Sequence, residues 1–340
     1  MIISRTPLRV SFAGGGSDLP EYYRNRPGSV VSAAINKYIY ITVNQKFDDL
    51  VRVSYSKTEL VETVDQVEHN IIREALRLAG IKRGIEVVYM GDVPLGTAGI
   101  GLGSSSSLAV GVLNALYAFK GQHVSGERLA REACEIEINV LKNPIGKQDQ
   151  YIAAYGGIQY IRFNSDDSVF VDPVIFPGET KKILNDKLML FYTGVTRVSS
   201  SILKEQGEKT KQNMAHLNDI VALSQKLLKK LQGNDLHGFG EILHEGWLLK
   251  KKLANGITNN RIDESYEKAL KAGAVGGKVL GAGGGGFLLF YCEKDKQDGV
   301  RRALSGLRET PFSFESQGSK IIYVSDCDRS CSVPRQGSEQ

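Results

Sequence analysis

The order of apolar and polar residues predicts a sheet interleaved with helices in the first half of the chain. Apolar side chains recur three and four positions apart between residues 67 and 79, and Gly80 ends the pattern, so we expect an amphipathic helix there. Residues 125–139 predict another helix, with Ser125, a residue type that caps helices, at its start. Runs of β-branched and aromatic residues predict strands over residues 2–13, 30–43, 50–55 and 85–90, and a hairpin over residues 158–163 and 169–174.

The pattern changes near residue 180 and becomes more helical. A strand over residues 187–193 precedes a long helical region that extends to about Gly273. Beyond it the pattern predicts a strand, a glycine run, a strand, a helix and a strand. The helical region divides into segments with apolar residues at helical spacing, which are residues 198–209, 211–232, 235–254 and 260–272.

Length and composition are those of an ordinary soluble globular protein. The chain has 340 residues, of which 41% are hydrophobic and 24% charged, and this length is comfortable for two domains. We expect an N-terminal domain over residues 1–180, a C-terminal domain over residues 181–326 and a loose tail over residues 327–340.

Charge and targeting signals narrow the class of partner. The net charge of +5 is spread along the chain, with Lys250–Lys252 as the compact basic run, which favours small anionic ligands over nucleic acid. Apolar runs fall short of a membrane span, and the first residues lack the regions of a signal peptide. We expect a cytoplasmic protein that binds neither nucleic acid nor membrane, and leave a homodimer open. The four cysteines lack metal-ligand spacing, which argues against zinc.

A glycine- and serine-rich run at residues 99–107 leads directly into an apolar helical pattern over residues 108–116. The first N–H groups of a helix have no internal partner and lie at the positive end of its dipole, so they bind phosphate. Glycines remove every Cβ from the approach path, and a serine hydroxyl can face a phosphate oxygen or Mg²⁺. The plain alternative is a flexible loop in which a serine caps the helix.

A second glycine run, at residues 278–287, contains the spacing G-x-G-x-x-G at Gly281, Gly283 and Gly286. This spacing marks a dinucleotide site where it opens a helix, but a strand pattern follows it here, which disfavours a dinucleotide-dependent oxidoreductase. Two interpretations stay open: a tight hairpin, or a loop that packs against the first glycine loop and closes a nucleotide site. The chain lacks the G-x-x-x-x-G-K-[ST] run of Walker-type loops.

Two carboxylates between the glycine runs suit phosphoryl transfer, which needs a magnesium ligand and a group that orients or deprotonates the acceptor hydroxyl. Glu137 is expected to end a helix, where its charge opposes the dipole, so its placement has a cost that function would explain. Asp149 follows a break at Pro144 and Gly146 and opens a short helix that ends at residues 156–157. Its plain alternative is a favourable charge at a helix N-terminus.

Together these residues resemble the three signatures of the GHMP kinase family, which includes galactokinase, homoserine kinase, mevalonate kinase and phosphomevalonate kinase. Residues 6–18 resemble the family's N-terminal strand and turn, residues 101–105 its phosphate loop, and residues 281–286 its third signature, in the family's order. The resemblance spans roughly residues 2–325. It implies an α+β, two-domain GHMP kinase fold, with an N-terminal ribosomal-protein-S5-like domain and a C-terminal ferredoxin-like α/β domain.

The resemblance also implies a role for each matching residue. Asp149 matches the catalytic aspartate, and Arg9 lies where relatives keep a basic residue close to the transferred phosphoryl group. Glu137 and Ser105 match the Mg²⁺ ligands. The residues implied in ATP binding are Gly101, Leu102, Gly103, Ser104, Ser105 and Ser106, and those implied in sugar binding are Ser17, Asp18, Lys147, Arg197, Gly283 and Gly284.

Residues 4–18, 146–151 and 192–197 further resemble the branch of the family that phosphorylates sugar phosphates of the heptose type. The implied reaction transfers the γ-phosphoryl group of ATP to the anomeric hydroxyl of D-glycero-D-manno-heptose 7-phosphate. The product, the 1,7-bisphosphate, would feed nucleotide-activated heptose for surface polysaccharide. Lys147 and Arg197 are the candidates for binding the 7-phosphate.

Two alternatives and one departure from the family pattern remain. The chain could act on an unphosphorylated sugar such as fucose or galactose, and a test of free against phosphorylated heptose separates these. A non-catalytic sensor of sugar and nucleotide is disfavoured because Asp149 is present. The segment Leu95–Ile100 is longer than the usual family spacing, which puts the mouth of the phosphate loop in doubt.

Overall fold

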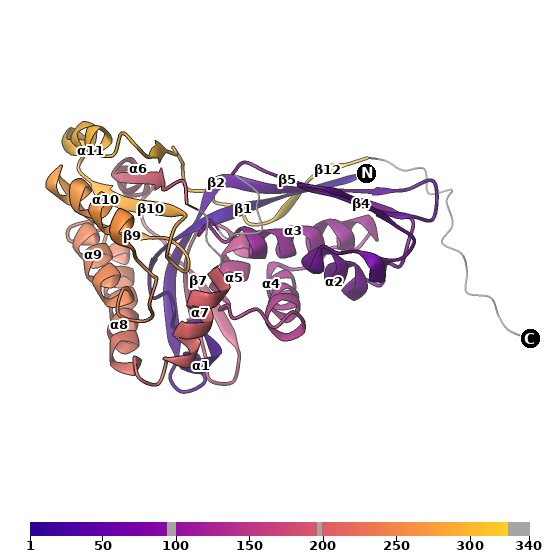
Figure 1. Ribbon diagram of the computed structural model, residues 1–340, viewed down its shortest axis with the longest axis horizontal. Helices are drawn as coiled ribbons and strands as arrows, with labels where there is room; N and C mark the ends of the chain where they lie inside the picture. The colour runs from indigo at the N-terminus through magenta and orange to yellow at the C-terminus, as the bar shows by residue number, and fades with distance from the viewer. Residues whose placement is uncertain (94–99, 196–198, 326–340) are drawn as a thin grey trace, which may run out of the picture.

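Two β-sheets and their covering helices make up the part of the chain that the structure describes, residues 1–93, 100–195 and 199–325 (Figure 1). The structure is a computed structural model. In the first sheet the order is β12-β1-β2-β5-β3-β4, and β6 pairs with β2 and β7 with β6. Its strands are β1 (Ile2–Ala13), β2 (Gly28–Gln45), β3 (Val51–Ser54), β4 (Thr58–Val61), β5 (Ile85–Gly91), β6 (Ile158–Phe163), β7 (Val169–Pro173) and β12 (Lys320–Val324).

Strand β2 organises the first sheet because it has partners along most of its length. One edge pairs antiparallel with β1, while the other pairs with β6 over residues 28–33 and with β5 over residues 39–45. Strand β3 pairs with β5 in parallel. Within this sheet every β1 residue from Thr6 to Ala13 is buried. The strand therefore carries Arg9 into the interior of the protein.

Helix α3 (Ser104–Phe119) is apolar on nearly all sides, and it covers one face of the first sheet (Figure 1). A helix of this composition needs burial all round, and α2, α4 and α5 pack against its remaining surface. Residues 106–113 are all buried. The other helices of this half are α1 (Pro20–Tyr23), α2 (Asn70–Leu78), α4 (Gly126–Cys134), α5 (Gln148–Tyr155) and α6 (Gly178–Asp186), with short 3-10 and π segments at Val64–Gln66 and Glu135–Val140.

The second sheet has the order β11-β8-β10-β9 and is antiparallel. Its β10 is buried and apolar along its whole length, which suits a strand covered on both faces. The strands are β8 (Leu188–Tyr192), β9 (Ala274–Val279), β10 (Phe287–Cys292) and β11 (Arg308–Glu309). The helices are α7 (Ser199–Glu208), α8 (Met214–Gln232), α9 (Phe239–Lys250), α10 (Asn260–Lys271) and α11 (Gln297–Ala303), and a 3-10 turn spans Lys294–Lys296.

The two halves share a hydrophobic core, because α8 and α9 contact the first sheet as well as each other. Phe12 on β1 meets Phe239 on α9 edge-on, with ring centroids 5.2 Å apart. The buried hydroxyls of Ser29 on β2 and Ser224 on α8 are hydrogen-bonded at 2.7 Å. The two halves are therefore held together by side-chain packing and not only by the chain segments that connect them.

Most predicted elements are confirmed. The strand and helix patterns up to residue 174 match β1 to β3, β5 to β7 and α2 to α5, and Ser125 caps α4 by accepting a hydrogen bond from the Arg128 N–H. The predicted helix over residues 125–139 differs in its second half, where the chain widens into the π-helix Glu135–Val140. Helix α6 and strand β4 were not predicted.

The end of the described chain crosses back to the first sheet. Strand β12 pairs antiparallel with β1, so residues 320–324 belong to the N-terminal sheet although they follow the C-terminal elements. Local pattern does not encode this return, because it depends on which strand edge is free. The domain boundary near residue 180 stays a prediction, and the predicted tail, residues 327–340, lies outside the described residues.

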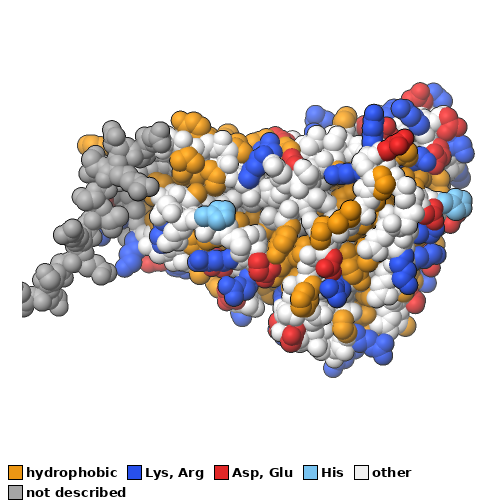
Figure 2. Space-filling view, turned by 180° about the vertical axis from the view of Figure 1, so that it is seen from behind, with side chains coloured by type: hydrophobic (Ala, Val, Ile, Leu, Met, Phe, Trp, Pro, Cys, Tyr) orange, Lys and Arg blue, Asp and Glu red, His pale blue; other side chains and the backbone are white. Residues whose placement is uncertain are grey.

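The surface mixes charges of both signs. On the face shown in Figure 2, Lys and Arg side chains are interspersed with Asp and Glu. This face therefore has no large patch of one sign that would attract a ligand of the opposite charge from a distance. Among the helices of the described ranges, none combines the length and the apolar composition needed to cross a bilayer.

The contact between α3 and β1 generates a stability prediction. A Cβ on Gly111 would lie 2.8 Å from Thr6 Oγ1, and the Gly111 carbonyl accepts a hydrogen bond from the buried Ser4 hydroxyl at 2.8 Å. We expect Gly111→Val to lower the free energy of unfolding by about 1–3 kcal/mol, because overpacking forces the helix off the strand. Denaturant unfolding measures this change. The control is Gly178→Val on α6, where a Cβ meets open space, and equal stability of the two variants would contradict the packing argument.

Candidate functional site

The first glycine loop leads into α3 without a side-chain cap. Gly101 and Gly103 have φ of +84° and +75°, and Gly103 is the N-cap residue of the helix. A Cβ on Gly103 would lie 3.2 Å from Asp149 Oδ2, so this position needs glycine for conformation and for space. The alternative of a serine cap is therefore wrong. Because no side chain occupies them, the first N–H groups of α3 stay available to an anion.

Asp149 is held by a bidentate ion pair with Arg9. The guanidinium Nε and Nη2 each lie 2.7 Å from one carboxylate oxygen of Asp149, and Nη1 donates to the carbonyl oxygen of Gly101. The Arg9 side chain is 4% exposed and that of Asp149 is 22% exposed. Such a fork fixes the plane of the carboxylate. One arginine on β1 thus aligns the carboxylate of α5 with the glycine loop.

Glu137 lies inside the π-helix and not at a helix end as predicted, since the helix continues to Val140. Its side chain is fully buried, its Oε2 accepts a hydrogen bond from the Gln150 amide at 2.7 Å, and its Oε1 makes none. Burial raises the pKa of Glu137 to about 7, an effect that the Ser106, Gln150 and Ser105 side chains oppose only in part. Short π-helical segments are frequent at functional sites, and this one directs a carboxylate into the protein interior.

Asp18, on the turn after β1, lines the same cavity as the first glycine loop. Its Oδ1 accepts the Gly16 N–H at 2.9 Å and its Oδ2 accepts the Gln148 side-chain amide at 3.1 Å. Burial raises the pKa of Asp18, and the charge of Asp149 adds to this effect. Asp18 therefore lies near Asp149 while keeping lone pairs for a further donor, as a ligand for hydroxyl groups requires.

The two glycine loops are packed backbone to backbone. A Cβ on Gly281 would lie 2.5 Å from the Gly101 Cα, and one on Gly286 would lie 2.3 Å from the carbonyl oxygen of Ile100. The second loop also joins β9 to the antiparallel β10. The hairpin is therefore confirmed, and so is the packing against the first glycine loop, while the closing of a nucleotide site by this loop stays a prediction.

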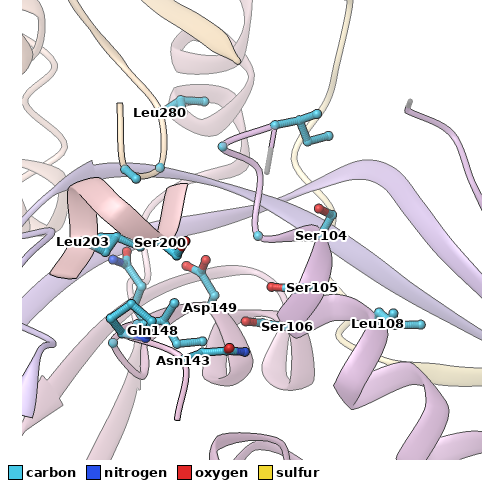
Figure 3. Close-up of a pocket in the computed structure, with 18 of the residues that line it drawn as sticks. Ser104, Ser105, Ser106, Leu108, Asn143, Gln148, Asp149, Ser200, Leu203 and Leu280 are labelled. Atoms are coloured by element: carbon cyan, nitrogen blue, oxygen red, sulfur yellow. The ribbon is translucent and has the colours of Figure 1, made fainter. Parts of the chain in front are cut away.

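Most of these groups line one cavity of about 780 Å³, which is large enough for a drug-sized ligand. Glu137 is not part of its lining and lies buried against Ser105 and Ser106, which are. In Figure 3 the Asp149 carboxylate lies between Ser200 of α7 and the residues Ser104 and Ser105 of α3. Leu280 of the second glycine loop lies above them in this view. Predicted site residues that line the cavity are Arg9, Asp18, Gly101, Gly103, Ser104, Ser105, Ser106, Asp149 and Gly283.

Two predicted sugar ligands have side chains engaged elsewhere. The Lys147 ammonium is 3.1 Å from Asp167 Oδ1 and lies over the Tyr23 ring, outside the cavity lining. The Ser17 hydroxyl is fully buried and donates to the carbonyl oxygens of Gly14 and Ser29, so it stabilises a turn and does not face a ligand.

Of the remaining predicted site residues, Leu102 and Gly284 do not line the cavity, and Arg197 lies outside the described residues. Leu102 contributes its side chain to the core and its carbonyl oxygen to the Arg9 N–H, and Gly284 donates its N–H to Ile257. Neither lines the cavity. Arg197 and most of the predicted loop mouth Leu95–Ile100 lie outside the described residues.

Two lysines in the cavity wall were not predicted as site residues. Lys250 at the end of α9 donates to the carbonyl oxygen of Gly281, and Lys278 on β9 donates to that of Phe12 at 3.1 Å. The signal for Lys278 was a charge inside an otherwise apolar strand pattern beside the glycine run. Lys250 was visible only as part of a basic run, which is usually a solvated surface.

The donor set fits a magnesium ion that arrives with a nucleotide. Among residues 1–93, 100–195 and 199–325, no three His, Cys, Asp or Glu side chains are placed to hold a metal by themselves. Mg²⁺ commonly binds through one or two carboxylates together with substrate phosphates. The unpartnered Oε1 of Glu137 and the Ser105 hydroxyl, close to the N-terminus of α3, suit that mode.

Comparisons with known proteins agree with this arrangement. The model of the GHMP kinases N terminal domain matches residues 67–157, and that of the GHMP kinases C terminal matches residues 225–307. The chain is 28% identical to the D-glycero-alpha-D-manno-heptose 7-phosphate kinase of Campylobacter jejuni, over 94% of this chain and 98% of that protein. It is also 28% identical to the L-fucokinase/L-fucose-1-P guanylyltransferase of Bacteroides fragilis, over 88% of this chain and 35% of that protein.

A solved structure extends the match to the whole fold. The crystal structure of a D-glycero-D-manno-heptose 1-phosphate kinase from Bacteroides thetaiotaomicron matches with a TM-score of 0.79 and 27% identity, over 96% of this chain and 100% of that one. The predicted α+β, two-domain fold class is confirmed by this similarity and by the two matched domain models.

The burial of Glu137 generates a pH prediction. Its pKa in the folded protein is about 7 against 4.5 for the ordinary carboxyl, so folding favours the protonated form. That contribution to stability is present below pH 4.5 and is lost as pH rises through 7. We therefore expect Glu137→Gln to be more stable than the unsubstituted protein by about 1–3 kcal/mol at high pH, but nearly equal to it at low pH.

Denaturant unfolding in metal-free buffer at about pH 5 and pH 8 measures this difference. The matched control is Glu135→Gln, which removes an exposed carboxylate from the same π-helix and should show no such pH dependence. A Glu137→Gln variant that is less stable at the higher pH would contradict the buried-charge argument.

Proposed function

The chain belongs to the GHMP kinase family, and from this premise we propose that it transfers the γ-phosphoryl group of ATP to the anomeric hydroxyl of D-glycero-D-manno-heptose 7-phosphate. The observation that carries the proposal is the Asp149 carboxylate, fixed by Arg9 beside the uncapped N-terminus of α3 in a cavity that also contains Asp18. Similarity to heptose phosphate kinases supports the choice of acceptor. A cytoplasmic location, where ATP is available, is part of the proposal.

The first glycine loop and α3 would bind the nucleotide. The free N–H groups at the start of α3 and the Ser104 hydroxyl would hold phosphate oxygens, a role that the uncapped helix start and the place of Ser104 in the cavity lining support. Glu137 and Ser105 would hold Mg²⁺, which when bound offsets negative charge on the phosphates. Because the glycine loops exclude side chains from this corner, the phosphates can approach the backbone closely.

Asp18 and Asp149 would divide the work on the sugar. Asp18 would accept hydrogen bonds from sugar hydroxyls, and Asp149 would orient the anomeric hydroxyl and take its proton. An anomeric hydroxyl is more acidic than an ordinary alcohol, so the base needs little tuning. Arg9 keeps the carboxylate in one orientation through two hydrogen bonds of 2.7 Å. A positioned base of this kind contributes roughly 10²- to 10⁴-fold to rate.

A kinase for an unphosphorylated sugar is the second candidate. The observation in its favour is the ion pair of Lys147 with Asp167, which removes an expected ligand of the 7-phosphate from the cavity. Similarity to a protein with fucokinase in its name points the same way. The two candidates share the nucleotide site and Asp149, and differ in what the far end of the sugar contacts.

Asp149→Asn tests the base. The amide keeps the shape of the side chain but cannot take a proton, so we expect the turnover number to fall at least about 100-fold while ATP affinity changes little. Coupled measurement of ADP release and calorimetric binding of ATP provide the two readouts. Asp172→Asn, which alters an exposed ion pair with Arg162, serves as the control. Near-normal turnover of Asp149→Asn would remove the base assignment.

An acceptor panel tests the substrate. With ATP and Mg²⁺, we expect heptose 7-phosphate to exceed free heptose, fucose and galactose in kcat/KM by about 100-fold or more, since each charge-assisted contact to the phosphate is worth about 1.5–3 kcal/mol. Mass spectrometry of the product shows whether a phosphate was added, and phosphorus NMR shows whether it is attached at the anomeric position. Equal turnover of free and phosphorylated heptose would sink the phosphate pocket and favour the second candidate.

A further inference from the structure

Two lysines from the C-terminal half face the reacting corner of the cavity. Lys250 ends α9, is partly buried, lines the cavity and donates a hydrogen bond to the carbonyl oxygen of Gly281. Lys278 lies on β9, is 6% exposed and also lines the cavity. Since Gly281 packs on Gly101, the Lys250 ammonium lies at the junction of the two glycine loops.

Neither lysine is neutralised by a partner in the described part of the chain. Among the residues that the structure describes, no carboxylate lies within ion-pair distance of Lys250 or Lys278, and their ammonium groups donate to backbone carbonyl oxygens. Burial lowers the pKa of Lys250 to about 8, and the charge of Arg9 adds to this, against the opposing charges of Asp18 and Asp149. Burial and the charges of Lys250 and Arg9 hold the pKa of Lys278 well below its usual value.

Neighbouring positive charges that are partly or fully buried and have no ion-pair partner among the described residues are costly, so two such lysines in one cavity favour an anionic ligand. An ammonium has three donors, and the contact to Gly281 uses one of those on Lys250. Arg9, the other cation of this corner, commits Nε and Nη2 to Asp149 and Nη1 to Gly101. Arg9 is thus held by protein partners on all three of its nitrogens, whereas the Lys250 ammonium can turn its other donors toward a negatively charged ligand between the loops and Asp149.

We propose that Lys250 binds the phosphoryl group during its transfer, in a cavity wall that it shares with Lys278. This inference rests on the proposed kinase function and deepens it. The bond between the γ-phosphorus and its bridging oxygen breaks, and ADP leaves with the electron pair. A bond from the anomeric oxygen to phosphorus forms, and the hydroxyl proton passes to Asp149. Lys250 keeps its protons and donates hydrogen bonds to the phosphoryl oxygens throughout.

The same chemistry could come from a second source, the phosphate that the sugar already carries. The place of Lys250 decides between them. Its electrostatic neighbours are Arg9, Asp18 and Asp149, the last two of which would contact the sugar in the proposed function, and its hydrogen bond goes to the loop that packs on the first glycine loop. A 7-phosphate lies at the end of the sugar remote from the anomeric carbon. The transferred group is therefore the source we assign.

Lys250→Met tests the assignment in the full-length protein, because it keeps the apolar stem and removes the charge. Calorimetry with Mg²⁺ compares the affinity for ADP with that for a non-hydrolysable ATP analogue carrying the γ-phosphate. We expect the ratio of the two affinities to change about tenfold to a hundredfold against the analogue, with ADP affinity nearly kept. The matched control is Lys252→Met, which removes an exposed charge two residues on and should leave the ratio unchanged. Lys250→Arg should restore part of the loss.

Kinetics separate the two sources of phosphate. We expect Lys250→Met to lower kcat about 10²- to 10³-fold with both phosphorylated and free heptose, since the lost contact is to the group in transfer. A loss confined to KM for the sugar phosphate, or an affinity ratio equal to that of Lys252→Met, would overturn the assignment. If the unsubstituted protein phosphorylates no heptose, the proposed acceptor is wrong, and the affinity ratio still decides the role of Lys250.

Discussion

The bidentate ion pair between Arg9 and Asp149 is the interaction on which the candidate site depends. It joins β1, the first glycine loop and α5, three segments that are distant in sequence, through contacts of 2.7 Å to both carboxylate oxygens and a hydrogen bond to Gly101. A planar guanidinium has the geometry to fix a carboxylate in one orientation, which a lysine at this place would not. The pair also explains why β1 is buried from Thr6 onward, since the strand has to deliver the arginine under the loop.

Close backbone approach is the second constraint. The two glycine loops touch at Gly101 and Gly281, where a Cβ on either residue would overlap the backbone of the other loop. This contact brings the C-terminal half, with Lys250 and Lys278, against the phosphate loop of the N-terminal half. The shared core around Phe12 and Phe239 holds the halves in that position. The loop contact and the shared core together hold the two halves around one cavity.

The charges of the cavity are arranged at a cost to stability. Glu137 is fully buried with one oxygen unpartnered, and Lys250 and Lys278 lack a neighbouring carboxylate among the described residues. A protein selected for stability alone would replace such groups by apolar ones of similar volume. Their joint presence beside an uncapped helix N-terminus supports the proposal that phosphate and a cation bind here.

The sequence by itself determined the elements and most of the candidate chemistry. Periodicity predicted β1, α2 and α3 because local pattern is what decides whether a segment can bury one face, and the glycine-serine run predicted a phosphate loop because helix N-termini have the same free donors everywhere. The tertiary structure alone decided the partners. Lys147 forms an ion pair with Asp167 outside the cavity lining, and Arg9 forms one with Asp149. Lys278, on β9, lines the cavity. These outcomes depend on which long-range neighbour satisfies each buried charge, and residue spacing does not encode that competition.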